Sequence, residues 1–304
     1  MLDIALLGTG GMMPMPSRFL TAMMGRLNGR LLLIDCGEGT QVTLKTLGWG
    51  FKAIDVICFT HYHADHISGL PGMLLTIGNS GRIEPLTLIG PTGLKKIVEG
   101  IMCIAPEIPF PIEYIEIDES TKEPICINGF CINGLVVDHT IKCIAYRIDI
   151  KRKGRFDIKK AEKLNIPRKM WSVLQKEGKV YIDGNIITDS MVMGEERKGI
   201  SVSYCTDSRP VRTIPEFIKN SDLFICEGMY GENEKKQKAV ENKHMLFSEA
   251  GKLASLGNVK ELWLTHFSPS LSEPSLFVDN AKCIFENTIV GQDRMCKTLY
   301  FEDK

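Results

Sequence analysis

A short run of histidines and one aspartate offers metal-binding chemistry within a single stretch of the chain. In the segment THYHADH, His61, His63, Asp65 and His66 lie within six positions, although the whole chain has only six histidines. Zinc accepts histidine nitrogen and carboxylate oxygen as ligands. In an extended segment the side chains of His61 and His63 point the same way, because strand side chains alternate with a period of two. Asp65 and His66 begin the turn into a helix and are directed at a neighbouring point, so one motif can supply two metal ions.

Further residues of the same types follow apolar runs that are typical of buried strands. They are Asp35 after LLLI, His61 after DVICFT, Asp138 and His139 after GLVV, Asp207 after SVSYCT, Glu227 after LFIC, and His266 after ELWLT. Strand carboxyl ends meet at one edge of a sheet in α/β-type proteins, so we expect one site there. A single histidine is usually structural. Five histidines and two aspartates in this arrangement suit two metal ions ~3.5–4 Å apart, with one carboxylate bridging them.

The elements that must position these residues are short apolar runs alternating with amphipathic stretches. Strands are predicted over 3–8, 30–35, 55–60, 86–90, 112–117, 134–138, 143–150, 200–206, 222–226 and 261–265. Helices are predicted over 39–47, 67–77, 92–103, 157–164, 169–177 and 246–256. This mixture favours an α+β or α/β fold of enzyme-like size.

Charge is balanced overall but concentrated in one segment. The 37 basic and 37 acidic residues cancel, so any contact with nucleic acid must come from a local patch. Residues 151–163 carry seven basic and two acidic residues. The stretch 151–199 looks inserted between two core strands. It is either a basic binding arm or an ordinary solvated charged face.

The cysteines and the amino terminus indicate a protein of a reducing compartment. The ten cysteines are spaced singly, several of them inside apolar runs, and Cys126 and Cys131 lack zinc-ribbon spacing. The first residues do not resemble a signal peptide, and no run approaches the ~20 apolar residues of a membrane span. We therefore expect buried, reduced thiols in a cytoplasmic protein.

The segment THYHADH is similar to the His-X-His-X-Asp-His motif of the metallo-β-lactamase superfamily. The chain resembles more narrowly the ribonuclease Z family of tRNA 3′-processing endonucleases. The segments that carry this resemblance are LLGTGGMMPMPSR, LIDCGEGTQ, HADHISGLPGML, YCTDSRP and LTHFS, and they span nearly the whole chain. The resemblance implies an α+β fold, a four-layer αββα sandwich, with a single catalytic domain over residues 1–304. Residues 151–199 would be its inserted substrate-binding arm.

The resemblance also implies the metal ligands. One zinc ion would be held by His61, His63 and His139, and a second by Asp65, His66 and His266, with Asp207 bridging. Manganese and iron suit similar ligands. Asp35 and Thr60 are expected to orient ligand rings, although Asp35 could instead cap the helix that follows it.

Proton transfer is assigned by the same resemblance to Asp65, His244 and Glu227. Asp65 would orient the nucleophile as a general base, and His244 would protonate the leaving oxygen while Glu227 holds its tautomer. The alternative for His244 is a surface histidine. The chain departs from the family pattern here, because Met245 and Leu246 stand where Ser-Thr is usual and Cys226 stands where His is usual. It departs again after Pro167, where Arg168 and Lys169 replace Gly-Pro.

The implied function is a zinc-dependent endoribonuclease that removes the 3′ trailer of precursor tRNA. Metal-hydroxide attack would leave a 3′-hydroxyl, and the expected partners are precursor tRNA and a second subunit in a homodimer, not DNA or a membrane. Two alternatives remain, a hydrolase of small phosphodiesters or other esters and a nucleic-acid-binding protein with a structural metal. An open ligand set disfavours the structural metal, and the basic insert favours RNA.

Overall fold

The computed structural model describes residues 1–105, 107–182 and 184–302, which form two compact units. The first unit consists of residues 1–150 and 200–300. The second consists of residues 151–199 together with Phe301 and Glu302. The stretch expected to be an insert therefore makes up almost the whole of the second unit.

Two seven-stranded sheets form the centre of the first unit within the described chain. The first sheet contains, in spatial order, β16 (Cys296–Leu299), β1 (Leu2–Gly8), β2 (Ala22–Leu27), β3 (Arg30–Ile34), β4 (Ile54–Cys58), β5 (Leu86–Pro91) and β6 (Ile112–Ile117). The second contains β15 (Thr288–Val290), β14 (Leu262–Thr265), β13 (Leu223–Glu227), β12 (Arg197–Cys205), β9 (Cys143–Arg152), β8 (Phe130–Val137) and β7 (Ile125–Ile127). β3 to β6 run parallel, as do β12 to β15, so the carboxyl ends within each set share one edge.

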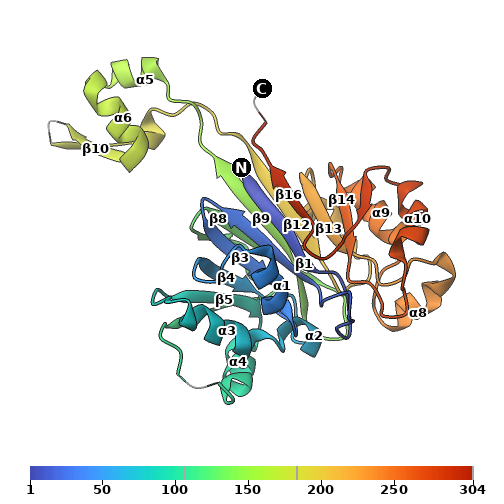
Figure 1. The fold of residues 1–304 in the computed structure, drawn as a ribbon. Helices are drawn as coiled ribbons and strands as arrows, with labels where there is room; N and C mark the ends of the chain where they lie inside the picture. The colour runs from blue at the N-terminus through green and yellow to red at the C-terminus, as the bar shows by residue number, and fades with distance from the viewer. Residues whose placement is uncertain (106, 183, 303–304) are drawn as a thin grey trace. The chain divides into compact units, whose positions relative to one another are not determined.

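Helices cover the outer faces of both sheets (Figure 1). The helices of the first sheet are α1 (Thr40–Leu47), α2 (Ala64–Ile67), α3 (Leu70–Asn79) and α4 (Leu94–Met102). Those associated with the second half are α7 (Ile214–Phe217), η2 (Asn233–Lys235), α8 (Lys236–Glu241), α9 (Phe247–Leu256), η3 (Pro274–Phe277) and α10 (Asp279–Lys282). This arrangement confirms the predicted αββα sandwich. Across the described residues, every helix is too short or too polar to span a membrane.

Packing on both faces of the sheet explains why the sequences of the strands are continuous apolar runs. β4 and β5 are buried along their whole length, because helices cover one face of the sheet and the second sheet covers the other. Two hydrogen bonds cross between the halves next to THYHADH. The Tyr146 hydroxyl donates to the Phe59 carbonyl over 2.7 Å, and the Ile144 amide donates to the Thr60 carbonyl over 2.9 Å. The histidine motif is thereby anchored from both sheets.

The helix predicted over 67–77 is in fact two helices, α2 and α3. The helix is interrupted at Gly69, whose amide donates to the carbonyl of Cys36 over 2.9 Å. A Cβ atom at Gly69 would lie 2.1 Å from the carbonyl oxygen of Gly37, so only glycine permits this approach. The break ties α2 to the segment that follows β3. It allows the metal motif to turn independently of α3.

Several short elements had no sequence prediction. They are β2, β7, β10 (Lys179–Ile182), β11 (Asn185–Thr188), β15, β16, α7, α8 and α10. Most of them have only three or four residues, too few to display a periodicity. The exceptions are α8 and β2, with six residues each, and in β2 two methionines and a glycine obscure the strand signal.

The expectation of single, buried, reduced cysteines is wrong for five of the ten. Cys126 and Cys131 form a disulfide, and Cys103, Cys283 and Cys296 are exposed. The two bonded cysteines face each other directly across the antiparallel pair β7 and β8. Such pairing depends on strand register, which their five-residue separation in sequence does not reveal.

The second unit has its own small core. It contains α5 (Ile158–Lys163), α6 (Arg168–Glu177), the antiparallel pair β10 and β11, and η1 (Asp189–Met191). Its buried apolar residues are Ala161, Ile166, Leu174, Val180, Ile187 and Val192. The Asp157 side chain caps α5 by accepting a hydrogen bond from the Lys160 amide over 3.1 Å. The basic stretch therefore belongs to a folded unit.

Candidate metal centre

The seven residues expected to bind metal lie together at one edge of the two sheets. Four of them come from THYHADH after β4, and the others follow β8, β12 and β14. Their ligand atoms form overlapping groups within 4.8 Å of one another, namely His61, His63 and His139; His61, His66 and Asp207; and Asp65, His66 and His266. Asp207 thus adjoins both histidine clusters. This is the position that a bridging carboxylate requires.

Three residues at this edge have a left-handed backbone. Asp35, Asp207 and His266 have φ angles of 62°, 51° and 56°; Asp35 and His266 directly follow a strand, and Asp207 comes after Thr206, the first residue beyond β12. For residues other than glycine this conformation is uncommon, and it clusters at functional sites. The sharp turn redirects each side chain from the sheet toward the centre. No sequence pattern distinguishes these turns from ordinary strand ends.

Glycines in two of the sequence motifs allow close approach to the centre. A Cβ atom at Gly11 would lie 2.6 Å from the His266 ring, and one at Gly37 would lie 2.0 Å from the Asp65 carbonyl oxygen. Both glycines therefore leave room that a side chain would fill. These contacts explain why glycine stands at these two positions of the segments LLGTGG and DCGEGT.

Asp35 orients the ring of His66. Its carboxylate accepts hydrogen bonds from His66 Nδ1 (2.8 Å), the Thr60 amide (2.8 Å) and the Thr60 hydroxyl (2.9 Å). The Nε2 atom of His66 is thereby directed at the centre. The alternative that Asp35 caps α1 is wrong, because Gly39 occupies that cap position.

The electrostatics of the cluster keep its two carboxylates ionised. Burial and the charge of His66 lower the pKa of His61, which leaves its imidazole neutral, as a ligand must be. Burial opposes ionisation of Asp207, but the charges of His266 and His66 outweigh it and hold its pKa well below the usual value. Burial likewise opposes ionisation of Asp65, whose pKa is nevertheless lowered by a hydrogen bond from His266 and by the charges of both histidines. The buried Asp207 and the partly buried Asp65 thus both remain ionised at neutral pH.

The spacing of the donor atoms fits tetrahedral metal sites. His63 Nδ1 lies 3.3 Å from His139 Nε2, and His66 Nε2 lies 3.3 Å from His266 Nε2. Tetrahedral zinc with Zn–N distances of ~2.0–2.1 Å places its ligand atoms about 3.3–3.4 Å apart. Asp207 Oδ2 is buried without a hydrogen-bond partner among the described residues, although both Nε2 atoms of the second pair are 3.3 Å away. A cation between these atoms would satisfy it.

His244 and Glu227 form a buried pair beside the metal ligands. His244 Nδ1 donates to Glu227 Oε2 over 3.0 Å, and Glu227 also accepts hydrogen bonds from the amides of Ser208 and Met245. Burial lowers the pKa of His244, but the charge and hydrogen bond of Glu227 prevail and raise it to about 9. The histidine side chain is only 12% exposed, which is inconsistent with a surface role. Nδ1 is engaged, so Nε2 is the atom left for the reaction.

Two of the departures from the family pattern, Cys226 and Met245, lie against each other. Cys226 Sγ is 3.9 Å from Met245 Sδ, and both side chains are fully buried. Each residue is the chain neighbour of one member of the His244–Glu227 pair. The hydrogen bond between His244 and Glu227 is nevertheless present beside this sulfur contact.

Sequence reasoning missed several residues that support the site. Arg209 donates to the His244 carbonyl and to both carboxylate oxygens of Glu249, which in turn accepts from the Leu246 amide over 3.0 Å. The Met12 amide donates to Asp65 Oδ2 over 2.7 Å. The only signal for Arg209 was its place in YCTDSRP, since its partners are distant in sequence.

A cavity of about 430 Å³ opens onto the metal ligands. Its lining includes His63, Asp65, His139, Asp207, His244 and His266, together with Met12, Thr140, Tyr230, Glu241 and Asn242. Asn242 donates to the Tyr230 hydroxyl over 2.9 Å and is thereby fixed in the wall. The cavity is large enough for a nucleotide-sized group.

Comparison with known proteins agrees with this architecture. The family model described as Anti-Pycsar protein Apyc1 matches residues 2–98. The metallo-β-lactamase fold protein YhfI of Bacillus subtilis aligns with a TM-score of 0.70 at 18% identity, covering 97% of this chain and 98% of its own. Human tRNase Z, short form, aligns with a TM-score of 0.69 at 22% identity, covering 98% and 100%. The fold and the clustered histidines and carboxylates define a protein of the metallo-β-lactamase fold with a candidate metal centre.

The curated relatives narrow this class. Ribonuclease Z of Clostridium kluyveri is 57% identical over 303 residues and aligns over the full length of both chains. Ribonuclease Z of Clostridium acetobutylicum is 53% identical, again over the full length of both. The chain belongs to the ribonuclease Z family.

Proposed function

We propose that this chain is a metal-dependent endoribonuclease that removes the 3′ trailer of precursor tRNA. Its full-length identity with ribonuclease Z proteins supports the substrate and the reaction. The observation that carries the chemistry is the pair of ligand clusters adjoining Asp207 beside the His244–Glu227 pair.

The proposal includes two zinc ions per chain. His61, His63 and His139 would hold one ion, Asp65, His66 and His266 the other, and Asp207 would bridge. When bound, two such ions lower the pKa of a water molecule and neutralise charge on the phosphate. The donor spacing of 3.3 Å supports this assignment, and elemental analysis of the loaded protein tests it. A content near two metals per chain is expected, and a content of one or less would contradict it.

The protein groups divide the proton transfers between them. Asp65 stays ionised, and its Oδ2 atom is oriented by the Met12 amide, so it can accept a proton from the attacking water. His244 is protonated at neutral pH, and its Nε2 can give a proton to the departing 3′ oxygen of the tRNA. Glu227 keeps the proton on Nδ1 and stabilises the imidazolium. The products are a tRNA with a 3′-hydroxyl and a trailer with a 5′-phosphate.

Cleavage of a precursor tRNA with a labelled 3′ trailer tests the function, with both product ends mapped. A single cut near the end of the acceptor stem, with a 3′-hydroxyl, is expected. Hydrolysis of a small chromogenic phosphodiester while precursor tRNA stays intact would favour the alternative of a small-molecule hydrolase.

The proposal further assigns the second unit to tRNA binding from the partner subunit of a homodimer. Its seven basic residues over 151–163, in a chain of zero net charge, support a role with RNA. Mixed dimers test the assignment. A His63→Ala subunit and a subunit lacking residues 152–198 should each be inactive on precursor tRNA, and mixing them should restore part of the activity. Activity that is not restored would contradict action across the dimer.

A further inference from the structure

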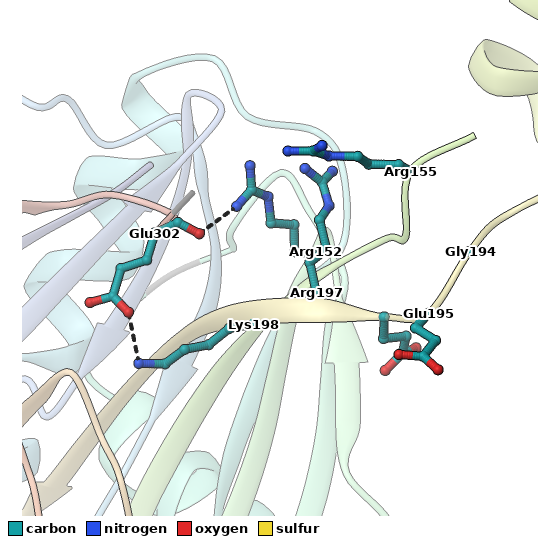
Figure 2. Close-up of a pocket in the computed structure, with 8 residues that line it drawn as sticks. Arg152, Arg155, Gly194, Glu195, Arg197, Lys198 and Glu302 are labelled. Atoms are coloured by element: carbon teal, nitrogen blue, oxygen red, sulfur yellow. Dashed lines mark hydrogen bonds and ion pairs between the residues drawn. The ribbon is translucent and has the colours of Figure 1, made fainter. Parts of the chain in front are cut away.

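A second cavity, of about 480 Å³, lies within the second unit and away from the metal ligands in sequence. It is lined by Arg152, Arg155, Gly194, Glu195, Glu196, Arg197, Lys198 and Glu302. Figure 2 shows the guanidinium groups of Arg152, Arg155 and Arg197 turned toward one another, and the carboxylate of Glu195 turned away from them. Like charges gathered in this way repel, so the arrangement calls for an anion between them.

Hydrogen bonds hold the base of this cavity in place. Arg152 donates to the Glu302 carbonyl over 3.0 Å and stacks on Phe301, while Arg197 Nε donates to the Lys153 carbonyl over 3.0 Å. Lys198 pairs with the Glu302 carboxylate over 3.2 Å. These contacts neutralise one acidic group and fix two of the arginine side chains.

Glycine packing brings the two walls together. A Cβ atom at Gly154 would lie 2.2 Å from the Gly194 carbonyl oxygen, and the Gly194 amide donates to the Arg155 carbonyl over 2.8 Å. Arg155 and Arg197 are far apart in sequence, and this crossing makes them neighbours across the cavity. The site is therefore built into the backbone of the unit.

Two guanidinium groups have N–H donors that can bind a ligand. Arg155 makes no side-chain hydrogen bond or ion pair with the described part of the chain, and the terminal nitrogens of Arg197 make none there either. Lys153, two residues before Arg155, is different, because it is paired with Asp189. Planar guanidinium groups match the oxygens of a phosphate in pairs.

We propose that this cavity binds a phosphate group of the RNA backbone, clamped between Arg155 and Arg197. This inference rests on the proposed function for the identity of the ligand. The four basic and three acidic residues of the lining leave a net charge of +1, which balances one phosphodiester. The cavity volume leaves room for the sugars on either side of it. Of the basic residues that line the cavity, Arg155 and Arg197 thus make the contact with the phosphate.

The double variant Arg155→Gln and Arg197→Gln tests the proposal in the full-length, metal-loaded enzyme. The KM for precursor tRNA should rise about tenfold, since charge-assisted hydrogen bonds to one group are lost. The slope of log affinity against log salt should flatten by about 0.7–0.9, the value for one phosphate, although two charges are removed. Hydrolysis of a small chromogenic phosphodiester should be unchanged.

The matched control is Lys176→Gln with Lys179→Gln, which removes the same charge from exposed positions on α6 and β10, outside both the cavity and the basic stretch 151–163. It should leave the KM within about twofold, because screened surface charges act weakly. Equal effects of both double variants would overturn the clamp in favour of a general field. An unchanged KM in the arginine variant would overturn it too, while normal cleavage by the wild type would leave the proposed function standing.

A titration with inorganic phosphate separates the site from its RNA ligand. Phosphate should shift the arginine Nε–Hε NMR resonances of Arg155 and Arg197, and the double variant should lose the response. If phosphate binds there but the variant processes precursor tRNA normally, the ligand is free phosphate and the RNA assignment fails. If the wild type shows neither response nor an effect on RNA binding, the cavity is not an anion site.

Discussion

Replacing Glu227 by glutamine isolates the electrostatic role of the buried pair. The glutamine keeps the size of the side chain and can still accept from His244 Nδ1 through its carbonyl oxygen, while its NH2 group can no longer accept from the Ser208 amide. It removes the negative charge that, against the opposing effect of burial, raises the pKa of His244 to about 9. Glu227 is fully buried, so solvent would not compensate for the loss.

The magnitude follows from the pKa. Without the carboxylate charge, the pKa of His244 should fall from about 9 to near its ordinary value of 6.5, because the lowering effect of burial is then opposed mainly by the charge of Asp207. At pH 8 the protonated fraction would drop from roughly nine-tenths to a few hundredths. The difference corresponds to about 3 kcal/mol of preference for the imidazolium. A raised pKa in the folded state stabilises the protein fully below pH 6.5, and this stabilisation is lost as the pH rises through about 9.

The assay has two parts. Histidine NMR resonances of the metal-free protein should show the His244 titration moving from near pH 9 to near pH 6.5 in the Glu227→Gln variant. In the metal-loaded enzyme, kcat for precursor tRNA at pH 8 should fall by ~10–100-fold, less at pH 6, with the metal content unchanged. A variant with wild-type kcat at pH 8 would refute His244 as the proton donor. A loss of metal would instead show that the pair supports the ligands.

Other predictions test the centre and its supports. His63→Ala should lose at least one metal per chain by elemental analysis, whereas His244→Ala should lower turnover by ~100- to 10,000-fold with the metals retained. Arg209→Met should lower the free energy of unfolding by about 3 kcal/mol in denaturant titrations, because it leaves the carboxylate of Glu249 buried without its main partner; an unchanged midpoint would show that the pair is dispensable. Gly11→Ala should displace the ring of His266 and weaken metal binding, which a chelator competition would measure, since the added Cβ would lie 2.6 Å from the ring.

Much of this protein can be read from residues that are close together in the chain. The THYHADH segment implies two metal positions because its side-chain directions depend only on local backbone geometry. Apolar runs such as those of β4 and β13 predict buried strands, and the polar residue after each run predicts a site at the strand ends. These features depend on periodicity over a few residues, which sequence displays directly.

Other features exist only because the tertiary structure joins distant segments. The left-handed turns at Asp207 and His266 are imposed by packing around the centre, since neither residue type demands them. The disulfide between Cys126 and Cys131 depends on the register of two edge strands.

The same holds for charges whose meaning depends on their neighbours. The pKa of His244 depends on a carboxylate that a separate strand carries into the same buried space. In the basic segment, composition alone makes Lys153 and Arg155 equivalent. The fold pairs the first with Asp189 and directs the second into a cavity. Sequence determined which chemical groups this protein has, and the tertiary structure decided which of them remain available, because partners and burial are set by contacts across the chain.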